Sequence, residues 1–406
     1  MTRRVVVTGM GVASPIGVGL PALLEGLRTA RSGTRLIRNF ASATFPNRLG
    51  GEIDDADLAG AALTADERQY LAKDRKALLA AIATLEAIQD AGESVFAHTT
   101  PFQRALSFGP GENPDCLRSL ANARETPYQM PFDGAAVWAA GKYHLAGPRA
   151  VNIGACAAGA MAIGEAFRLV RAGVVPVAVT GGHDAIASPL GVMGFSILGA
   201  LGSHHDEPTR ASRPFDVTRN GFVPGEGAGI LVLEDLEHAL ARGARIHGEI
   251  LGYGASLDAY RPTAPEPSGR GACLAMRGAL RMAGWAPEVV QYVNAHGTST
   301  PLNDKTETLA IKQVLGAHAY QIPVSSTKSQ IGHLVAGAGA VELIGSLLAM
   351  AAGFVPATIN LTHPDPDCDL DYVPGVVRAL DYDRFLSNSF AFGGQNACIA
   401  AARYQA

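Results

Sequence analysis

Short apolar runs alternate with longer alanine-rich stretches along this chain. The short runs predict buried strands at 4–8, 104–109, 149–154, 176–182, 228–234, 246–252, 290–295, 322–326 and 397–403. The longer stretches predict helices at 64–91, 156–173, 235–242, 268–284, 304–315 and 336–353. Strands that interleave with helices in this way are typical of an α/β protein in which helices cover both faces of the sheet.

Two long uncharged stretches need separate interpretation, because each is long enough for a membrane helix. Residues 5–24 contain Pro15 and Pro21, which break a single helix. We interpret them as a buried strand, VVVTG, then a glycine turn and the start of a helix. Residues 343–362 are interrupted by Gly353 and predict a buried helix followed by a strand. We therefore expect no membrane span and a cytoplasmic location.

A weak internal sequence repeat predicts two similar halves that meet near residue 240. AGA occurs at 158–160 and at 338–340, and each copy is followed at the same spacing by a similar motif, GVVP or GFVP. The N-terminal TGMGVAS also weakly resembles LGYGAS, which begins at Leu251. Chance similarity in a Gly/Ala-rich chain is the alternative. If the repeat is real, the halves are 1–240 and 241–406.

Composition limits the classes of function. The 406 residues are 48% hydrophobic and 17% charged, with a formal net charge of -4. This balance excludes a disordered chain and argues against a nucleic-acid-binding protein. The low charged fraction indicates a large core or a buried interface. The five cysteines include no CxxC pair, so neither a disulfide framework nor a zinc ribbon fits, and we expect a reducing compartment.

Cys156 is the first candidate for chemistry. It lies in VNIGACAAGA (151–160), where a strand is predicted to end and a helix to begin. The N–H groups and positive dipole end of a helix N-terminus stabilise a thiolate and can hold an oxyanion. The alternative is a small buried hydrophobic residue, which is the common fate of a free cysteine.

Two histidines and a lysine also occur in loops that follow predicted strands. His296 lies in YVNAHGTSTP, and Lys328 and His333 share the segment SSTKSQIGHLV. The carboxyl ends of strands in α/β sheets are where ligands bind. The hydroxyls of Thr298 and Thr300 suit the polar arm of a substrate. A lone histidine is more often a surface or structural residue, but three such groups in Gly/Ser/Thr-rich loops favour chemistry.

Other patterns are interpreted more simply. Phe390 and Phe392 flank Ala391 before paired glycines and are either core residues or a movable aromatic gate. Neither GMGVAS nor GEGAG has the spacing and setting of a nucleotide-binding loop. The cluster of His204, His205, Asp206 and Glu207 is interpreted as a solvated turn rather than a metal site.

These segments together closely resemble the elongating β-ketoacyl-acyl carrier protein synthases (types I and II) over nearly the whole chain. The resemblance rests on RRVVVTGMGVASPIG, the Cys156 segment, ASRPFD, GEGAG, NAHGTSTPLNDKTET, SSTKSQIGHLVAGAGAVE and NSFAFGG. It implies the thiolase fold, with two similar halves in five α-β-α-β-α layers. The first half would carry the nucleophilic cysteine and the second both catalytic histidines.

The resemblance also implies a role for each site residue. Cys156 would take an acyl chain from acyl carrier protein as a thioester. His296 and His333 would promote decarboxylation of malonyl-acyl carrier protein and stabilise the enolate, and Lys328 would support His333. The backbone N–H groups of Cys156 and Phe392 would form the oxyanion hole, with Phe392 also gating the acyl pocket.

Further residues are assigned supporting roles by the same resemblance. Thr298 and Thr300 would bind the phosphopantetheine arm. Phe195 and Phe390 would line the acyl pocket and its gate. Glu342 would support the catalytic residues without contacting the substrate. No cofactor is implied beyond the phosphopantetheine of the carrier protein, and no catalytic metal. Some relatives hold a structural monovalent cation near residues that match Asn294, Glu307, Glu342, Ser387 and Asn388.

The chain departs from the family pattern at several positions that bear on specificity. Ala391 stands where glycine usually separates the two phenylalanines, and Gln395 replaces a threonine. The acyl-pocket turn reads SFGPGEN (107–113), in which Pro110 and Glu112 would reshape the pocket or its approach. Asp66 and Glu67 make the expected carrier-docking helix partly acidic. Chain length, cognate carrier, and use in fatty-acid or in specialised polyene or polyketide synthesis therefore stay open.

Two alternatives to a homodimeric condensing enzyme remain on sequence grounds. A non-catalytic chain-length-factor subunit of a ketosynthase heterodimer would typically lack the cysteine, but Cys156 is present. A non-decarboxylating thiolase would need a second cysteine as a base, and Cys398 follows the synthase motif FGGQN instead. We expect a dimer that works with acyl carrier protein, formed with a second copy or with a related subunit.

Overall fold

The computed structural model describes residues 2–111 and 133–406. Its main sheet contains β1 (Val5–Ser14), β2 (Gly17–Val18), β5 (Arg104–Pro110), β6 (Arg149–Val151), β7 (Val177–Ala185), β8 (Glu226–Asp235), β9 (Gly248–Leu257), β10 (Tyr292–Asn294), β11 (Val324–Ser325), β14 (Arg384–Phe390) and β15 (Gln395–Ala402). Two small sheets pair β3 (Thr34–Leu36) with β4 (Leu49–Gly51) and β12 (Phe354–Val355) with β13 (Arg378–Ala379).

The α-helices are α1 (Leu20–Arg28), α2 (Asp55–Leu58), α3 (Ala65–Leu71), α4 (Arg75–Ala91), α6 (Gly134–Tyr143), α7 (Ala158–Arg171), α8 (Pro189–Ile197), α9 (Leu236–Ala241), α10 (Arg270–Ala283), α11 (Pro301–Leu315), α12 (Lys328–Ile331) and α13 (Ala338–Ala351). Three short 3₁₀ turns matter for the site, namely η4 (Ala155–Ala157), η8 (Val335–Gly337) and η9 (Phe392–Gly394). Within the described residues, no helix is both long enough and apolar enough to cross a membrane.

The strand order of the main sheet has an internal symmetry. It runs β11-β10-β14-β15-β9-β1-β8-β7-β5-β6, with β2 paired to β1 outside this path. The order from β1 outward to β6 mirrors the order from β9 outward to β11. The two groups of five strands meet where Val5–Val7 of β1 pair antiparallel with Gly248–Ile250 of β9.

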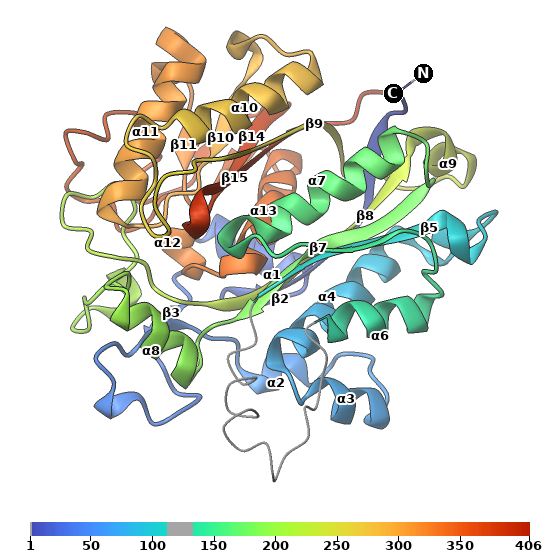
Figure 1. Ribbon diagram of the computed structural model, residues 1–406, viewed down its shortest axis with the longest axis horizontal. Coiled ribbons are helices and arrows are strands. Elements are labelled where there is room, and N and C mark those ends of the chain that lie inside the picture. The colour runs from blue at the N-terminus through green and yellow to red at the C-terminus, as the bar shows by residue number, and fades with distance from the viewer. Residues whose placement is uncertain (1, 112–132) are drawn as a thin grey trace.

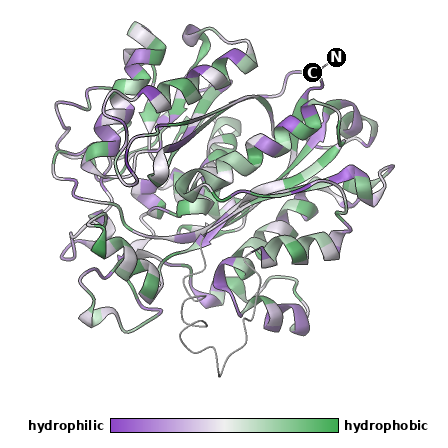
Figure 2. Ribbon diagram, viewed as in Figure 1, coloured by the Kyte–Doolittle hydropathy of each residue, from purple (hydrophilic) through white to green (hydrophobic). Residues whose placement is uncertain are grey.

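Helices cover these strands in layers (Figure 1). Helix α4 packs on β1, β7 and β8, and α10 packs on β9 and β15. Helices α7 and α13 contact each other and strands from both groups, so they form a central layer. Both are alanine- and glycine-rich and mostly buried, and Figure 2 shows α13 and the strands as largely hydrophobic. The α/β class and the layer order expected from the sequence are confirmed.

Paired glycines allow the helices to approach the strands closely in both groups. A Cβ at Gly9 or Gly11 would lie 2.2 or 2.0 Å from a backbone oxygen of α4. A Cβ at Gly252 or Gly254 would lie 2.1 or 2.0 Å from a backbone oxygen of α10. The weak similarity of TGMG to LGYG therefore corresponds to the same packing contact made twice.

Several sequence predictions of element bounds were wrong. The glycine turn expected after VVVTG is absent, because β1 continues to Ser14 and uses its glycines for contact with α4. The helix expected over 64–91 is divided into α3 and α4, since Asp74 has an extended backbone and its side chain accepts a hydrogen bond from the N–H of Lys76. The strands expected at 149–154, 290–295 and 322–326 are shorter, and β14 was not anticipated.

Candidate active site

Cys156 lies in the turn η4, between the end of β6 and the start of the central helix α7. Ala155 before it has a φ of 45°, in the left-handed region that few residues other than glycine adopt. This turn places the thiol at the helix N-terminus, as the sequence predicted. The residue is only 7% exposed.

The pKa of the Cys156 thiol differs from the sequence expectation of a stabilised thiolate. Burial raises this pKa to about 12, against the opposing effects of the Lys328 charge and of the backbone N–H groups of Phe392 and Cys156. Desolvation therefore outweighs the helix terminus and the nearby cation. The thiol is protonated near neutral pH, so the proton must leave as the sulfur attacks.

Alkylation of Cys156 should report this raised pKa directly. Because the thiolate is the nucleophile, the rate of reaction with iodoacetamide should rise about tenfold per pH unit from about pH 7 to about pH 10. The rate for an ordinary thiol instead levels off near pH 8.5. Mass spectrometry of the Cys156 peptide measures the rate, with free cysteine as the reference. A plateau below about pH 8 would contradict the desolvated thiol.

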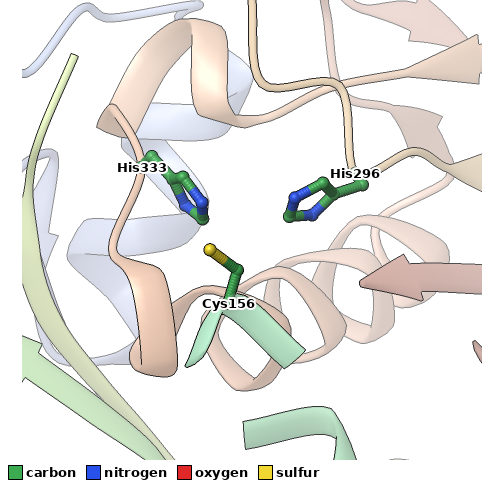
Figure 3. Close-up of side chains that lie close together, drawn as sticks. All are labelled: Cys156, His296 and His333. Atoms are coloured by element: carbon green, nitrogen blue, oxygen red, sulfur yellow. The ribbon is translucent and has the colours of Figure 1, made fainter. Parts of the chain in front are cut away.

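His296 and His333 face Cys156 from two other segments of the chain (Figure 3). His296 follows β10, and His333 lies between α12 and η8. The ligand atoms of the three side chains all lie within 4.8 Å of one another, which is also close enough to share one metal ion. The two imidazole rings are 5.3 Å apart and nearly perpendicular. The structure thus brings together the three residues that the sequence singled out.

Hydrogen bonds that do not involve the thiol hold the ring of His333 and the backbone of His296. The N–H of Val335 donates to Nδ1 of His333 at 3.2 Å, so the neutral ring carries its proton on Nε2. Nε2 is buried without a hydrogen-bond partner and is a free donor toward the site. The backbone N–H groups of His296 and Gly297 donate to Glu307 at 2.8 Å each.

The imidazoles are held neutral by their surroundings. Burial lowers the pKa of His296 and of His333 well below the usual value, and the Lys328 charge lowers both further. Neutral imidazoles can donate a hydrogen bond to a developing enolate without first losing a proton. The Lys328 charge thus supports both rings.

Lys328 is itself paired with Glu342. Its Nζ lies 2.6 Å from Oε1 of the glutamate, and both side chains are almost fully buried. Burial raises the pKa of Glu342, whereas Lys328 and Asn294 lower it. The position of the glutamate behind Lys328, rather than among the reacting atoms, agrees with its expected supporting role.

The residues expected near a structural cation lie close together. Asn294 Nδ2 donates to Ser387 Oγ at 3.1 Å and to Glu342 Oε2 at 3.5 Å, and Asn388 Nδ2 donates to Glu307 at 3.2 Å. The Oδ1 atoms of Asn294 and Asn388 are buried without a partner. Unpartnered amide oxygens beside carboxylates are the donors that hard cations prefer, so this group fits a monovalent cation.

A cavity of about 410 Å³ opens onto Cys156, His296 and His333. Thr298, Thr300, Phe390 and Phe392 line it, and the two threonine hydroxyls lie 2.8 Å apart. Asp258 also lines the cavity.

Phe195 is not among the residues that line the cavity but packs against two that do. Its ring contacts Phe222 at 5.2 Å and Phe392 at 6.4 Å, and Phe222 in turn contacts His333 at 5.1 Å. Phe222 was missed in the sequence, because a single aromatic in a loop carries no periodic signal. Phe222 also lines the cavity, and it joins Phe195 to His333.

The departures from the family pattern have mixed structural consequences. Ala391 is extended (φ -126°, ψ 155°), a conformation open to any residue, so its methyl group adds no backbone strain. Glu112 and Asn113 of the expected pocket turn lie outside the described residues.

The other described cysteines take no part in the site. Cys273, Cys368 and Cys398 are buried away from the cluster of Cys156, His296 and His333, and Cys116 lies outside the described range.

Comparison with known proteins agrees with this geometry. The N-terminal domain model of β-ketoacyl synthases matches residues 2–239, and the C-terminal domain model matches residues 247–362. The 3-oxoacyl-[acyl-carrier-protein] synthase 2 of Synechocystis is 46% identical, with 99% of each chain covered.

Two solved structures carry the same fold. One is a ketosynthase in complex with a type II PKS acyl-carrier protein, at 32% identity and a TM-score of 0.88 with both chains fully covered. The other is the ishigamide ketosynthase/chain length factor, at 36% identity, a TM-score of 0.87 and full coverage of both chains. The thiolase-type fold expected from the resemblance is thereby confirmed, and the chain belongs to the β-ketoacyl synthase family.

Proposed function

We propose that the chain is a condensing enzyme that elongates an acyl chain carried by acyl carrier protein. The single observation that carries this proposal is the convergence of Cys156, His296 and His333 within 4.8 Å in the lining of one cavity. The same cluster argues against a non-catalytic chain-length-factor role, which would not require a thiol between two imidazole donors.

The reaction divides into two steps that the site residues can support. First, Cys156 Sγ forms a bond to the acyl carbonyl carbon, the thioester of the carrier breaks, and the thiol proton passes to the leaving phosphopantetheine sulfur. The N–H groups of Cys156 and Phe392 hold the oxygen that becomes negative. The acyl group keeps its activation in the new thioester.

In the second step the malonyl carboxylate leaves as CO₂, and its bonding electrons form an enolate. The Nε2–H of His333 and the ring of His296 stabilise the enolate oxygen. The enolate carbon then bonds to the acyl carbon, and the bond to Cys156 breaks to regenerate the thiol after protonation. Thr298 and Thr300 bind the phosphopantetheine arm, and no further cofactor is needed for this chemistry.

Several assembly features belong to the same proposal. The mirrored strand order and the two domain models support halves at 1–240 and 241–406.

The edge of the sheet at β6 is where we place a second subunit. Strand β6 is the last strand at this edge, and Ile153 after it is 62% exposed. The neighbouring structures contain an acyl-carrier protein or a chain length factor, which supports the carrier as partner. The catalytic thiol favours the reducing cytoplasm.

A condensation assay tests this function. The protein is incubated with malonyl-acyl carrier protein and a panel of acyl primers, and products are followed by mass spectrometry. We expect an acyl mass on Cys156, release of CO₂ and a 3-oxoacyl product longer than the primer. A protein that neither acquires the acyl group nor releases CO₂, with carriers and any partner subunit supplied, is not a condensing enzyme.

A further inference from the structure

Asp184 is a buried carboxylate that the proposed reaction does not use. It lies near the end of β7, is 1% exposed, and does not line the cavity. One oxygen, Oδ2, accepts a hydrogen bond from the N–H of Ala336 at 3.2 Å, and Oδ1 accepts from the N–H of Ala185 at 2.8 Å. The carboxylate therefore ties β7 to the turn η8 that follows His333.

The turn at η8 has an unfavourable backbone conformation. Val335 has a φ of 44°, and the left-handed region is a genuine outlier for a β-branched residue. Such strain persists only where the surrounding structure holds the backbone in place. The N–H of this same residue donates to Nδ1 of His333 and so determines which ring nitrogen carries the proton.

We propose that Asp184 is a positioning residue for His333, which acts by holding the backbone of Val335 and Ala336 through the Ala336 N–H. This inference rests on the proposed condensing function. With that contact in place, the Val335 N–H remains directed at Nδ1, and the Nε2–H of His333 remains a donor toward the enolate.

Two glycines allow the backbone to pack closely around Asp184 and Ala336. A Cβ at Gly111 would lie 2.0 Å from the Asp184 carboxyl, and a Cβ at Gly182 would lie 2.2 Å from the Ala336 oxygen. The Asp184 charge also raises the pKa of the Cys156 thiol. Burial raises the pKa of Asp184 itself to about 7, so the contact with the Ala336 N–H, rather than a fixed negative charge, is what the positional task requires.

The internal symmetry of the fold supports the same assignment. Turns η4 and η8 precede the equivalent helices α7 and α13, and Ala155 and Val335 have nearly the same left-handed φ of 45° and 44°. By the repeat of AGA, Ala336 occupies the place of Cys156. One turn offers its N–H to the substrate oxygen, whereas Asp184 binds the equivalent N–H in the other turn.

The test compares the two half-reactions in Asp184 variants. Asp184→Ala removes both acceptor oxygens, and Asp184→Ser keeps a hydroxyl on a side chain too short to reach Ala336. Asp184→Asn keeps one acceptor oxygen, but its amide nitrogen cannot accept the second N–H. Thr180→Val is the matched control, since Thr180 is also buried on β7 but donates to Ser107 instead. Acylation of Cys156 and CO₂ release from malonyl-acyl carrier protein are measured separately on the folded proteins.

Decarboxylation should fall about tenfold or more in the alanine and serine variants, because a small misplacement of a catalytic group has effects of this size. Acylation should change by less than about threefold, and the Thr180→Val protein should match wild type in both steps. Asp184→Asn should lose less decarboxylation than Asp184→Ala, because its one oxygen can still accept from the Ala336 N–H. Unchanged decarboxylation in both Asp184→Ala and Asp184→Ser, an equal loss of both steps, or an asparagine variant as impaired as alanine would overturn the proposal.

A spectroscopic readout separates this inference from the proposed function. In protein with ¹⁵N-labelled histidine, the His333 signals, assigned by their loss in His333→Ala, should show a single Nε2–H tautomer in wild type. The same signals should shift toward a tautomer mixture in Asp184→Ser, and less so in Asp184→Asn. An inactive wild-type protein would refute the function, whereas an unchanged tautomer in Asp184→Ser would refute the role of Asp184.

Discussion

Replacing Cys156 with alanine is expected to lower condensation by at least about 10⁴-fold, a size typical for loss of a catalytic nucleophile, while malonyl decarboxylation remains measurable. Alanine has no atom that can carry the acyl group. The histidines should nevertheless keep their geometry, because His296 is held by Glu307 and His333 by the N–H of Val335. Mass spectrometry of the 3-oxoacyl product and measured CO₂ release distinguish the two activities.

The matched control for this variant is Cys273→Ala. Cys273 is also buried, but it lies on α10, where its thiol contacts Gln313 rather than the site. Its loss should leave condensation within about twofold of wild type, as expected for a residue outside the reacting group. Full condensation by the Cys156→Ala protein would show that the thiol is not the acyl carrier. Loss of decarboxylation together with condensation would show that the histidines depend on the sulfur for their placement.

The sequence predicted the individual site residues well, because local sequence features mark their positions. Cys156, His296 and His333 each stand at a strand end or a helix start, and those boundaries follow from apolar runs and glycines. The sequence spacing of the three residues does not show that their side chains converge. They lie on three segments that are far apart in the chain and come together only in the tertiary structure around the central helices. The resemblance to a known family supplied that step, and the 4.8 Å cluster supports it.

Other features could not be predicted from the sequence for physical reasons. Gly9 and Gly11 have the composition of a turn, yet they allow β1 to lie against α4, so only the tertiary contact identifies their role. The helix terminus at Cys156 predicted a low thiol pKa, but complete burial has the larger effect. Phe222 and Asp184 act through contacts with segments far away in the chain, and no local pattern marks them.

Replacing Glu342 with alanine is expected to destabilise the protein by about 3–5 kcal/mol, because it leaves the Lys328 ammonium buried without its partner. Lys328 is 1% exposed, and its Nζ lies 2.6 Å from the carboxylate. Lys328→Met should be less harmful, since burial already raises the pKa of Glu342 and the lone carboxyl can take up a proton. Denaturant unfolding of both single variants measures the difference.

The double variant Lys328→Met/Glu342→Leu separates stability from chemistry. Replacing both charges with apolar side chains of similar size should restore most of the lost stability. The Lys328 charge lowers the pKa of His296 and His333, so its removal should raise both values. Decarboxylation should then fail at a higher pH than in wild type as the solution is acidified, because the rings become protonated earlier. If the double variant is stable and its decarboxylation rate falls at the same low pH as that of wild type, the ion pair has only a packing role in the core.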